Sequence, residues 1–175
     1  MNVFWPAGMT ALTATGAILL ITAGVAHALR PAQHRAVLRT HRLFPTKWSP
    51  VVAATTTGAE LLVGSGVLFV LSTASANHEW PAAAQAALYS AFAAYAAVLR
   101  TRRAGVPCGC FGAEKVSWAV VARAVVLAAG SAGYGTNGAV PDRWSCVAAG
   151  VVLAMANHLL PAWRGIAGGK PGRRG

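Results

Sequence analysis

The chain has 175 residues, of which 55% are hydrophobic and only 11% are charged. Because soluble domains carry about 25% charged residues, this composition excludes an ordinary soluble globular protein. The net charge of +11 would suit a nucleic-acid-binding protein, but the basic residues stand in short clusters beside apolar runs, as membrane topology requires, and we expect no binding of DNA or RNA.

Five apolar runs follow one another along the chain. A membrane-spanning helix needs about 20 mostly apolar residues, and the runs that approach this length are 9–29, 50–73, 81–99, 117–134 and 145–163. The fourth is the least regular, because it contains Arg123 and because Gly130, Gly133 and Gly135 are expected to break its helix early. We therefore predict an all-α integral membrane helical bundle of four to five transmembrane helices within residues 1–163, followed by a basic, disordered tail at 164–175.

The tryptophans give an independent indication of a membrane protein. Each of the six lies at or near an end of a predicted span, and none lies in the middle of one. Indole rings prefer the headgroup layer of a bilayer, so this distribution is the aromatic belt expected of a membrane protein. The six are Trp5, Trp48, Trp80, Trp118, Trp144 and Trp163.

The basic residues predict the orientation of the chain. Thirteen of the 15 Lys and Arg residues fall in alternate connections, at 30–47, 100–116 and 164–175. Connections rich in Lys and Arg stay in the cytoplasm, so five spans place the N-terminus outside the plasma membrane and the C-terminus inside. Within the first of these connections, residues 31–42 mix apolar and basic side chains and are predicted to form a short helix lying in the membrane interface.

Two of the three cysteines, Cys108 and Cys110, stand one residue apart in the sequence PCGCFG at 107–112. Two thiols at this spacing between glycines can close a small, strained disulfide, and strained, exposed disulfides are the reactive ones. Basic residues of the 100–116 connection favour the thiolate. A redox or thiol-exchange pair is therefore the first interpretation, with a structural turn and a metal or cluster site as alternatives; zinc, however, needs four ligands. Cys146, inside an apolar run, is either a packing residue or a third thiol.

Two ionisable residues fall inside predicted spans. Glu60 lies about 11 residues into the second span, near mid-membrane, and Arg123 lies about one and a half turns into the fourth. An ionisable group in the membrane is costly, so it should face the bundle and be paired or neutral. The two match in charge, although their depths differ.

Two interpretations of these ionisable residues stay open. They are either a structural polar pair or a functional proton site or quinone-facing group near the thiols. A quinone is the one candidate cofactor, and no metal ligand set is predicted. His27 and His158 are interpreted as interface residues near cytoplasmic helix ends rather than as ligands.

These motifs resemble those of the MauE family of methylamine utilisation proteins, which is related to the broader DoxX-like group of small membrane proteins. The resemblance is carried by PCGCFG at 107–112 with Ser117, Trp118 and Arg123 after it, and by the acid in GAELLVG at 58–64. The first helix, ending in a basic connection, also resembles the family. The CGCFG segment is the most specific part, and the stretch that follows it is short in this chain.

The resemblance implies a multi-span membrane protein that serves the processing, transport or maturation of the small, disulfide-rich subunit of methylamine dehydrogenase, alongside a thioredoxin-like partner. For this chain it implies a membrane thiol–disulfide oxidoreductase acting on an exported protein, with Cys108 and Cys110 as the redox pair and Glu60 and Arg123 in support. Because the positive-inside rule places the pair in the cytoplasm, a re-entrant loop or Cys146 would pass electrons outward. A non-redox membrane scaffold or small-molecule carrier, in which CGC only shapes a turn, is the alternative function.

Overall fold

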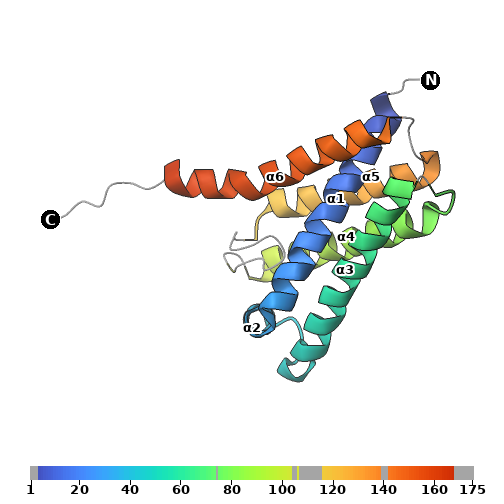
Figure 1. Cartoon of the computed structure of the whole chain (residues 1–175). Coiled ribbons are helices and arrows are strands. Elements are labelled where there is room, and N and C mark those ends of the chain that lie inside the picture. The colour runs from blue at the N-terminus through green and yellow to red at the C-terminus, as the bar shows by residue number, and fades with distance from the viewer. Residues whose placement is uncertain (1–3, 74, 104–105, 107–115, 139–141, 168–175) are drawn as a thin grey trace.

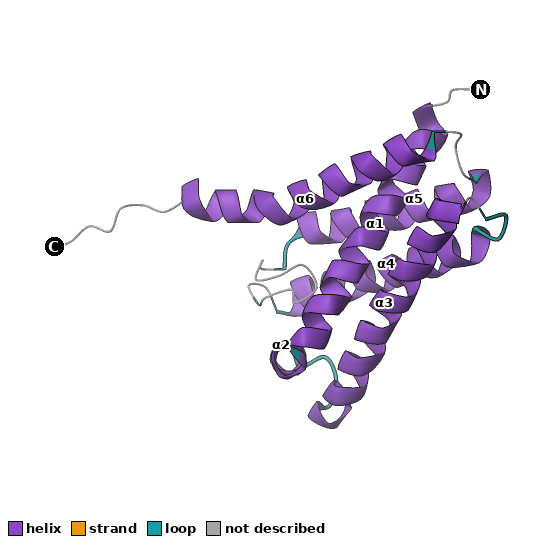
Figure 2. Ribbon diagram, viewed as in Figure 1, coloured by secondary structure: helices purple, strands orange, loops and turns teal. Residues whose placement is uncertain are grey.

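The computed structural model of the chain describes residues 4–73, 75–103, 106, 116–138 and 142–167, without the side chains of 158 and 160–167. The described residues form helices joined by short connections and contain no strand (Figure 2), which confirms the all-α prediction. In chain order these elements are α1 (Phe4–Leu29), α2 (Pro31–His41), the 3-10 turn η1 (Thr46–Trp48), α3 (Ser49–Thr73), α4 (Glu79–Arg102), α5 (Trp118–Asn137) and α6 (Arg143–Ala167).

Helix α1 runs through the centre of the bundle. It packs against α3, α5 and α6, and α4 packs against α5 (Figure 1). Of the apolar 18-residue stretch of α1, 50% is buried inside the protein, compared with 28–39% in the other three candidate spans. Ala14 and Ala17 of α1 are completely buried, because small side chains let neighbouring membrane helices approach closely.

Four helices of the described chain are long and apolar enough to cross a bilayer. They are α1, α3 with the η1 turn that precedes it, α4, and α5. This confirms the predicted membrane bundle at its lower count. Helix α6 begins before and ends after the predicted run at 145–163, and its role as a fifth span stays a prediction. Residues 164–167 belong to α6, and residues 168–175 lie outside the described part of the chain, so the basic, disordered tail stays a prediction.

The glycines of α5 do not break this helix, contrary to the prediction. Helix α5 is continuous over its 20 residues. A Cβ atom at Gly130 would lie 2.5 Å from Cβ of Leu12, and one at Gly133 would lie 2.8 Å from Sδ of Met9. In a bilayer no water competes for the backbone hydrogen bonds, so glycine is tolerated within a helix and allows close helix contact. These glycines therefore hold α5 against α1.

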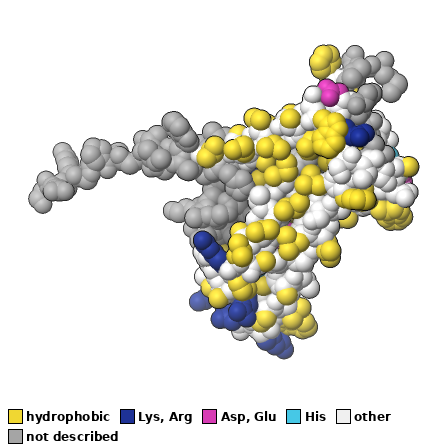
Figure 3. All heavy atoms as spheres, viewed as in Figure 1, with side chains coloured by type: hydrophobic (Ala, Val, Ile, Leu, Met, Phe, Trp, Pro, Cys, Tyr) yellow, Lys and Arg dark blue, Asp and Glu magenta, His cyan; other side chains and the backbone are white. Residues whose placement is uncertain are grey.

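One end of the bundle carries most of the positive charge. The ends of α1 and α4, the starts of α3 and α5 and the whole of α2 lie there, and we call it the basic end (Figure 1). Figure 3 shows Lys and Arg side chains gathered over this end. Two of the predicted basic connections therefore share one side of the bundle, as the positive-inside rule requires. Their described basic residues are Arg30, Arg35, Arg39, Arg42, Lys47, Arg100, Arg102 and Arg103.

The tryptophans with described side chains stand at helix ends, as the sequence predicts. They are 52–81% exposed, which suits indoles facing lipid headgroups rather than a protein core. These residues are Trp5, Trp48, Trp80, Trp118 and Trp144. The side chain of Trp163 lies outside the described part.

Candidate functional site

A buried carboxylate lies between α1 and α3. The Glu60 residue of α3 is 0% exposed, and its Oε2 atom lies 2.8 Å from Nδ1 of His27, in the last turn of α1. Its other oxygen, Oε1, has no hydrogen-bond partner among the described residues. Gly24 of α1 lets the two helices meet here, because a Cβ atom at this position would lie 3.2 Å from Cβ of Glu60. The acid therefore forms a hydrogen-bonded pair with a histidine inside the bundle.

A second histidine stacks on the first because of the turn between α1 and α2. Helix α1 ends at Leu29, and Pro31, which cannot continue a helix but suits a first turn, begins α2. The turn lays the His34 ring on the His27 ring, with centroids 3.8 Å apart and planes at 30°. His34 is 7% exposed, and its Nε2 atom has no hydrogen-bond partner in the described part of the chain. We call Glu60, His27 and His34 the histidine–glutamate cluster.

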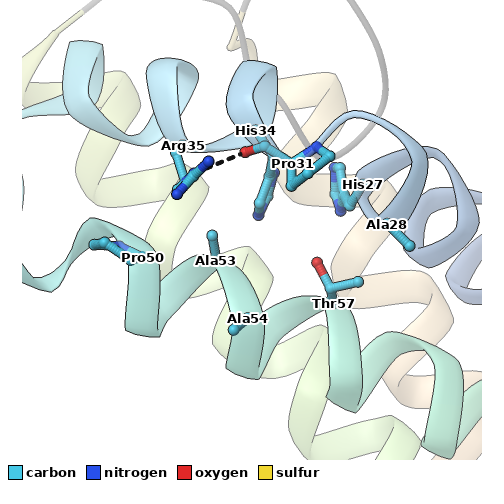
Figure 4. Close-up of a pocket in the computed structure, with 9 residues that line it drawn as sticks. All are labelled: His27, Ala28, Pro31, His34, Arg35, Pro50, Ala53, Ala54 and Thr57. Atoms are coloured by element: carbon cyan, nitrogen blue, oxygen red, sulfur yellow. Dashed lines mark hydrogen bonds between the residues drawn. The ribbon is translucent and has the colours of Figure 1, made fainter.

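A cavity of about 300 Å³ lies beside this cluster, between the end of α1, the start of α2 and the start of α3. Figure 4 shows both imidazole rings reaching from the α1–α2 turn toward α3, with the hydroxyl group of Thr57 pointing back at them. Arg35 lies on one side, where its Nε atom donates a hydrogen bond of 3.2 Å to the carbonyl of Pro31. The lining residues are His27, Ala28, Pro31, His34, Arg35, Pro50, Ala53, Ala54 and Thr57. Polar groups thus face one another within a mostly apolar wall.

At most one histidine of the cluster is expected to carry a positive charge at neutral pH. Two stacked imidazolium rings would repel each other, and the carboxylate of Glu60 lies beside His27. Burial, and then the charges of His27 and His41, lowers the pKa of His34 from its ordinary value of 6.5 to about 4. His34 is therefore neutral at pH 7. A carboxylate with two imidazoles can bind and transfer protons near this pH. Among the described residues, no three His, Cys, Asp or Glu side chains are placed to share a metal ion.

Protonation of His34 is expected to weaken the fold at low pH. The pKa is about 4 in the folded protein and 6.5 in the unfolded chain, so the unfolded chain binds the proton first as the pH falls. The contribution of His34 to the free energy of unfolding is therefore complete above pH 6.5 and is lost as the pH falls toward about 4. A His34→Phe variant keeps a ring in the stack but takes no proton. Thermal unfolding in nanodiscs at several pH values should show a flatter profile for this variant; an identical profile contradicts the prediction.

Cys108 and Cys110 lie outside the described residues, so their arrangement stays a prediction. The chain on either side of them is held together, because the N–H of Val116 donates a hydrogen bond of 3.0 Å to the carbonyl of Val106. Both valines pack with residues from the end of α4 and the start of α5. Segment 107–115 therefore leaves and re-enters the described fold at the basic end, the same end of the bundle as the histidine–glutamate cluster.

Arg123 and Cys146 do not belong to this cluster. Arg123 stands in the second turn of α5, and the ion-pair partner that the structure gives Glu60 is His27 rather than Arg123. Cys146 is buried in the first turn of α6 and forms no disulfide with any described residue. Helix α6 starts near the end of α5, so Cys146 lies at the opposite end of the bundle from Val116 (Figure 1). The 20 residues of α5 separate the two ends by about 30 Å.

The histidines are the site residues that sequence reasoning missed. The interpretation of His27 as an interface residue needs correction, because it is 9% exposed and bonds to Glu60. The sequence signal that could have revealed them is Pro31, which follows the end of the first span at Leu29 and starts a turn there. A histidine just before this turn and another just after it are brought to the same level. The side chain of His158 lies outside the described part.

Residues 6–136 match the family model described as methylamine utilisation protein MauE. The chain belongs to the MauE family. The match confirms the resemblance noted in the sequence, and it includes the histidine–glutamate cluster, the cysteine pair and nearly all of α5. No curated protein and no solved structure matches the chain. With four helices that can cross a bilayer, this MauE protein is a multi-pass membrane protein, and its family is named after methylamine utilisation.

Proposed function

We propose that this MauE-family protein is a membrane thiol–disulfide oxidoreductase that helps an exported protein to mature, with Cys108 and Cys110 as its redox pair. Family membership and the CGC sequence support this function. The structural observation in its favour is the hydrogen bond between Val106 and Val116, which anchors both ends of the thiol-containing segment to the bundle. An anchored segment with two thiols one residue apart suits a strained and therefore reactive disulfide.

The exchange requires a dithiol partner, for which a thioredoxin-like protein is the candidate. One thiolate of the partner attacks the Cys108–Cys110 disulfide and forms a mixed disulfide, and the second partner thiolate then displaces the cysteine pair. The partner leaves as a disulfide and the pair is left as two thiols, so two electrons and two protons have moved. The reduced pair is then the source of the two electrons that reduce a disulfide of the exported protein. Basic side chains at this end of the bundle, Arg100 and Arg102, favour the thiolates.

We place the protein in the plasma membrane, with its basic end facing the cytoplasm. In this orientation the N-terminus lies outside the cell and the C-terminus lies inside. The cysteine pair then faces a cytoplasmic reductant. Cys146 lies at the other end of the bundle and is the candidate thiol for the outward step. Because a bilayer core is about 30 Å thick, the electrons need a carrier between the ends. A quinone dissolved in the bilayer, which also takes up two electrons and two protons, is the candidate cofactor.

The cavity favours a second candidate function, that of a small-molecule carrier. At about 300 Å³, with a few polar groups in a mostly apolar wall, it has the size and character of a small-ligand site. In that case the CGC sequence would only shape the turn between α4 and α5. The two functions differ in whether the thiols are needed.

Replacing both thiols with serine distinguishes the two functions. In cells with the Cys108→Ser/Cys110→Ser variant, the exported protein should accumulate in the same oxidised or mispaired state as in cells without the protein. A Cys146→Ser variant tests the outward step separately, and immunoblots of membranes should show equal amounts of all variants. An unchanged redox state of the exported protein in the double variant rejects the thiol function and favours the carrier.

Labelling with a membrane-impermeant maleimide tests the orientation and the redox state. In a Cys146→Ser background, the pair should be labelled only after the cells are lysed and the protein is reduced. This result indicates an inward-facing disulfide. Labelling in intact cells without reduction would contradict both the orientation and the disulfide.

A further inference from the structure

The histidine–glutamate cluster combines a buried acid with a route of access. Glu60 is 0% exposed, yet His27 contacts both Glu60 and the cavity. Its Nδ1 atom lies 2.8 Å from Oε2 of Glu60, and its ring lines the space beside α2 (Figure 4). A proton that reaches the cavity can therefore pass to the carboxylate through one side chain.

Two polar atoms of the histidine–glutamate cluster lack the hydrogen bonds that a purely structural cluster should have. Oε1 of Glu60 and Nε2 of His34 belong to residues that are more than nine-tenths buried, and neither atom has a hydrogen-bond partner within the described chain. Buried polar groups that only stabilise a fold are normally hydrogen-bonded, because an unpaired one loses its hydrogen bonds to water without replacement. An ionisable residue within a membrane span is costly as well. Both costs are explained if these atoms bind protons or water during function.

Electrostatics limit the pair to one proton. With one shared proton Glu60 and His27 together carry no net charge, whereas none leaves a negative charge and two leave a positive charge inside the bundle. The stacked His34, whose pKa is lowered to about 4, stays neutral at pH 7 and does not compete for the proton. Titratable or charged groups around the cluster in the described part of the chain include Arg35 and His41 of α2 and Tyr89 of α4. The hydroxyl of Tyr89 is already bound, because it donates a hydrogen bond of 2.7 Å to the carbonyl of Gly16.

We propose that the cluster is a proton-binding site, in which Glu60 and His27 share one proton and exchange it with water at the basic end through the cavity. The cavity of about 300 Å³ has space for several water molecules. In uptake, an O–H bond of a hydronium ion breaks and an N–H bond on His27 forms, and the Glu60 carboxylate stabilises the resulting imidazolium, so atoms and charge balance. The site gives the bundle a group that takes up a proton from one side of the membrane. This inference goes beyond the proposed function and does not depend on the thiols.

The shared proton is tested on the full chain in nanodiscs with isotope-labelled histidine. Nuclear magnetic resonance of the ring nitrogens reports the protonation state of each histidine. At pH 7, His27 should be protonated in the wild-type protein and neutral in Glu60→Gln, which keeps the shape of the side chain but carries no charge. His34 should be neutral in both proteins. An equally protonated His27 in the two proteins overturns the shared proton, and circular dichroism with gel filtration checks that the variant is folded.

The route of access is tested by filling the cavity. In Figure 4 the side chain of Ala53, which lines the cavity, points toward Arg35 and His34. Thr55 of the same helix is exposed and does not line the cavity. An Ala53→Leu variant should therefore slow the exchange of the His27 ring proton with deuterated water several-fold relative to a Thr55→Leu control. Neither position touches the shared proton, so the protonation state of His27 should stay as in the wild type. Equal exchange rates in the two leucine variants overturn the route through the cavity.

Discussion

Replacing Gly64 with leucine is expected to separate α1 from α3 and to lower the free energy of unfolding by about 3 kcal/mol or more. Even a Cβ atom at Gly64 would lie 2.8 Å from Cγ1 of Ile21 and 2.9 Å from the backbone oxygen of Ala17. The isoleucine side chain can rotate, but the backbone oxygen moves only if α1 moves. Because the same contact aligns His27 with Glu60, the fold and the histidine–glutamate cluster should be disrupted together.

A Gly66→Leu variant is the matched control for this change. It lies two residues further along α3, and a Cβ atom there would have no other atom within 4 Å. Leucine favours a helix more than glycine does, so the control should be as stable as the wild type or slightly more stable. Thermal unfolding of both variants in nanodiscs provides the measurement. Equal losses of stability at the two positions would show that the close contact is not the cause.

The helices of this protein could be predicted from the sequence because a bilayer imposes simple requirements. Every backbone polar group must be satisfied within a span, so a long apolar run has to be a helix. The second run, predicted at 50–73, is α3 at Ser49–Thr73. The helices differ from the predictions mainly where they extend beyond the apolar run, as α4 does from 81–99 to Glu79–Arg102. Polar residues at these ends can continue a helix into the headgroup layer, where hydropathy no longer marks its boundary.

The partner of Glu60 could not be predicted by counting residues along the spans. Counting from the start of each helix assumes that the helices begin at one level. In the structure α3 starts well past the end of α1 (Figure 1), because α2 and η1 lie between them in the chain. Glu60, although 11 residues into α3, therefore lies beside the last two turns of α1, next to Gly24 and His27, rather than beside its middle. The vertical offset of neighbouring helices comes from side-chain packing, which no local pattern reports.

The cysteine pair can be found in the sequence, whereas the histidine–glutamate cluster cannot. Two thiols one residue apart form a local motif, so a thiol-exchange hypothesis can be drawn from the sequence alone, and the family resemblance that includes this motif is confirmed by the match over residues 6–136. The histidine–glutamate cluster joins residues from three helices. His27 and Glu60 are 33 residues apart in the sequence. Nothing in the sequence near Glu60 indicates a histidine partner. Only the assembled bundle reveals this site.

Removing one member of the His27–Glu60 pair should destabilise the bundle strongly. A His27→Leu variant leaves both carboxylate oxygens of Glu60 without a partner among the described residues. Breaking a buried ion pair in this way costs about 3–5 kcal/mol, and we expect the lower end because the lone acid can take a proton and become neutral. A Glu60→Met variant leaves a neutral histidine that has lost one hydrogen bond, which costs about 1–3 kcal/mol.

Replacing both members should restore most of the stability. Two apolar side chains of similar size fill the same space without a desolvation cost, so His27→Leu/Glu60→Met should lie within about 1 kcal/mol of the wild type. Unfolding of the four proteins in nanodiscs completes a double-mutant cycle and measures the coupling of the pair directly. A stable double variant that no longer binds the shared proton means that the chain keeps the pair for its chemistry, because leucine and methionine would hold the helices as well. Losses that simply add in the double variant mean instead that the two side chains stabilise the bundle independently of each other, which contradicts the coupling expected here.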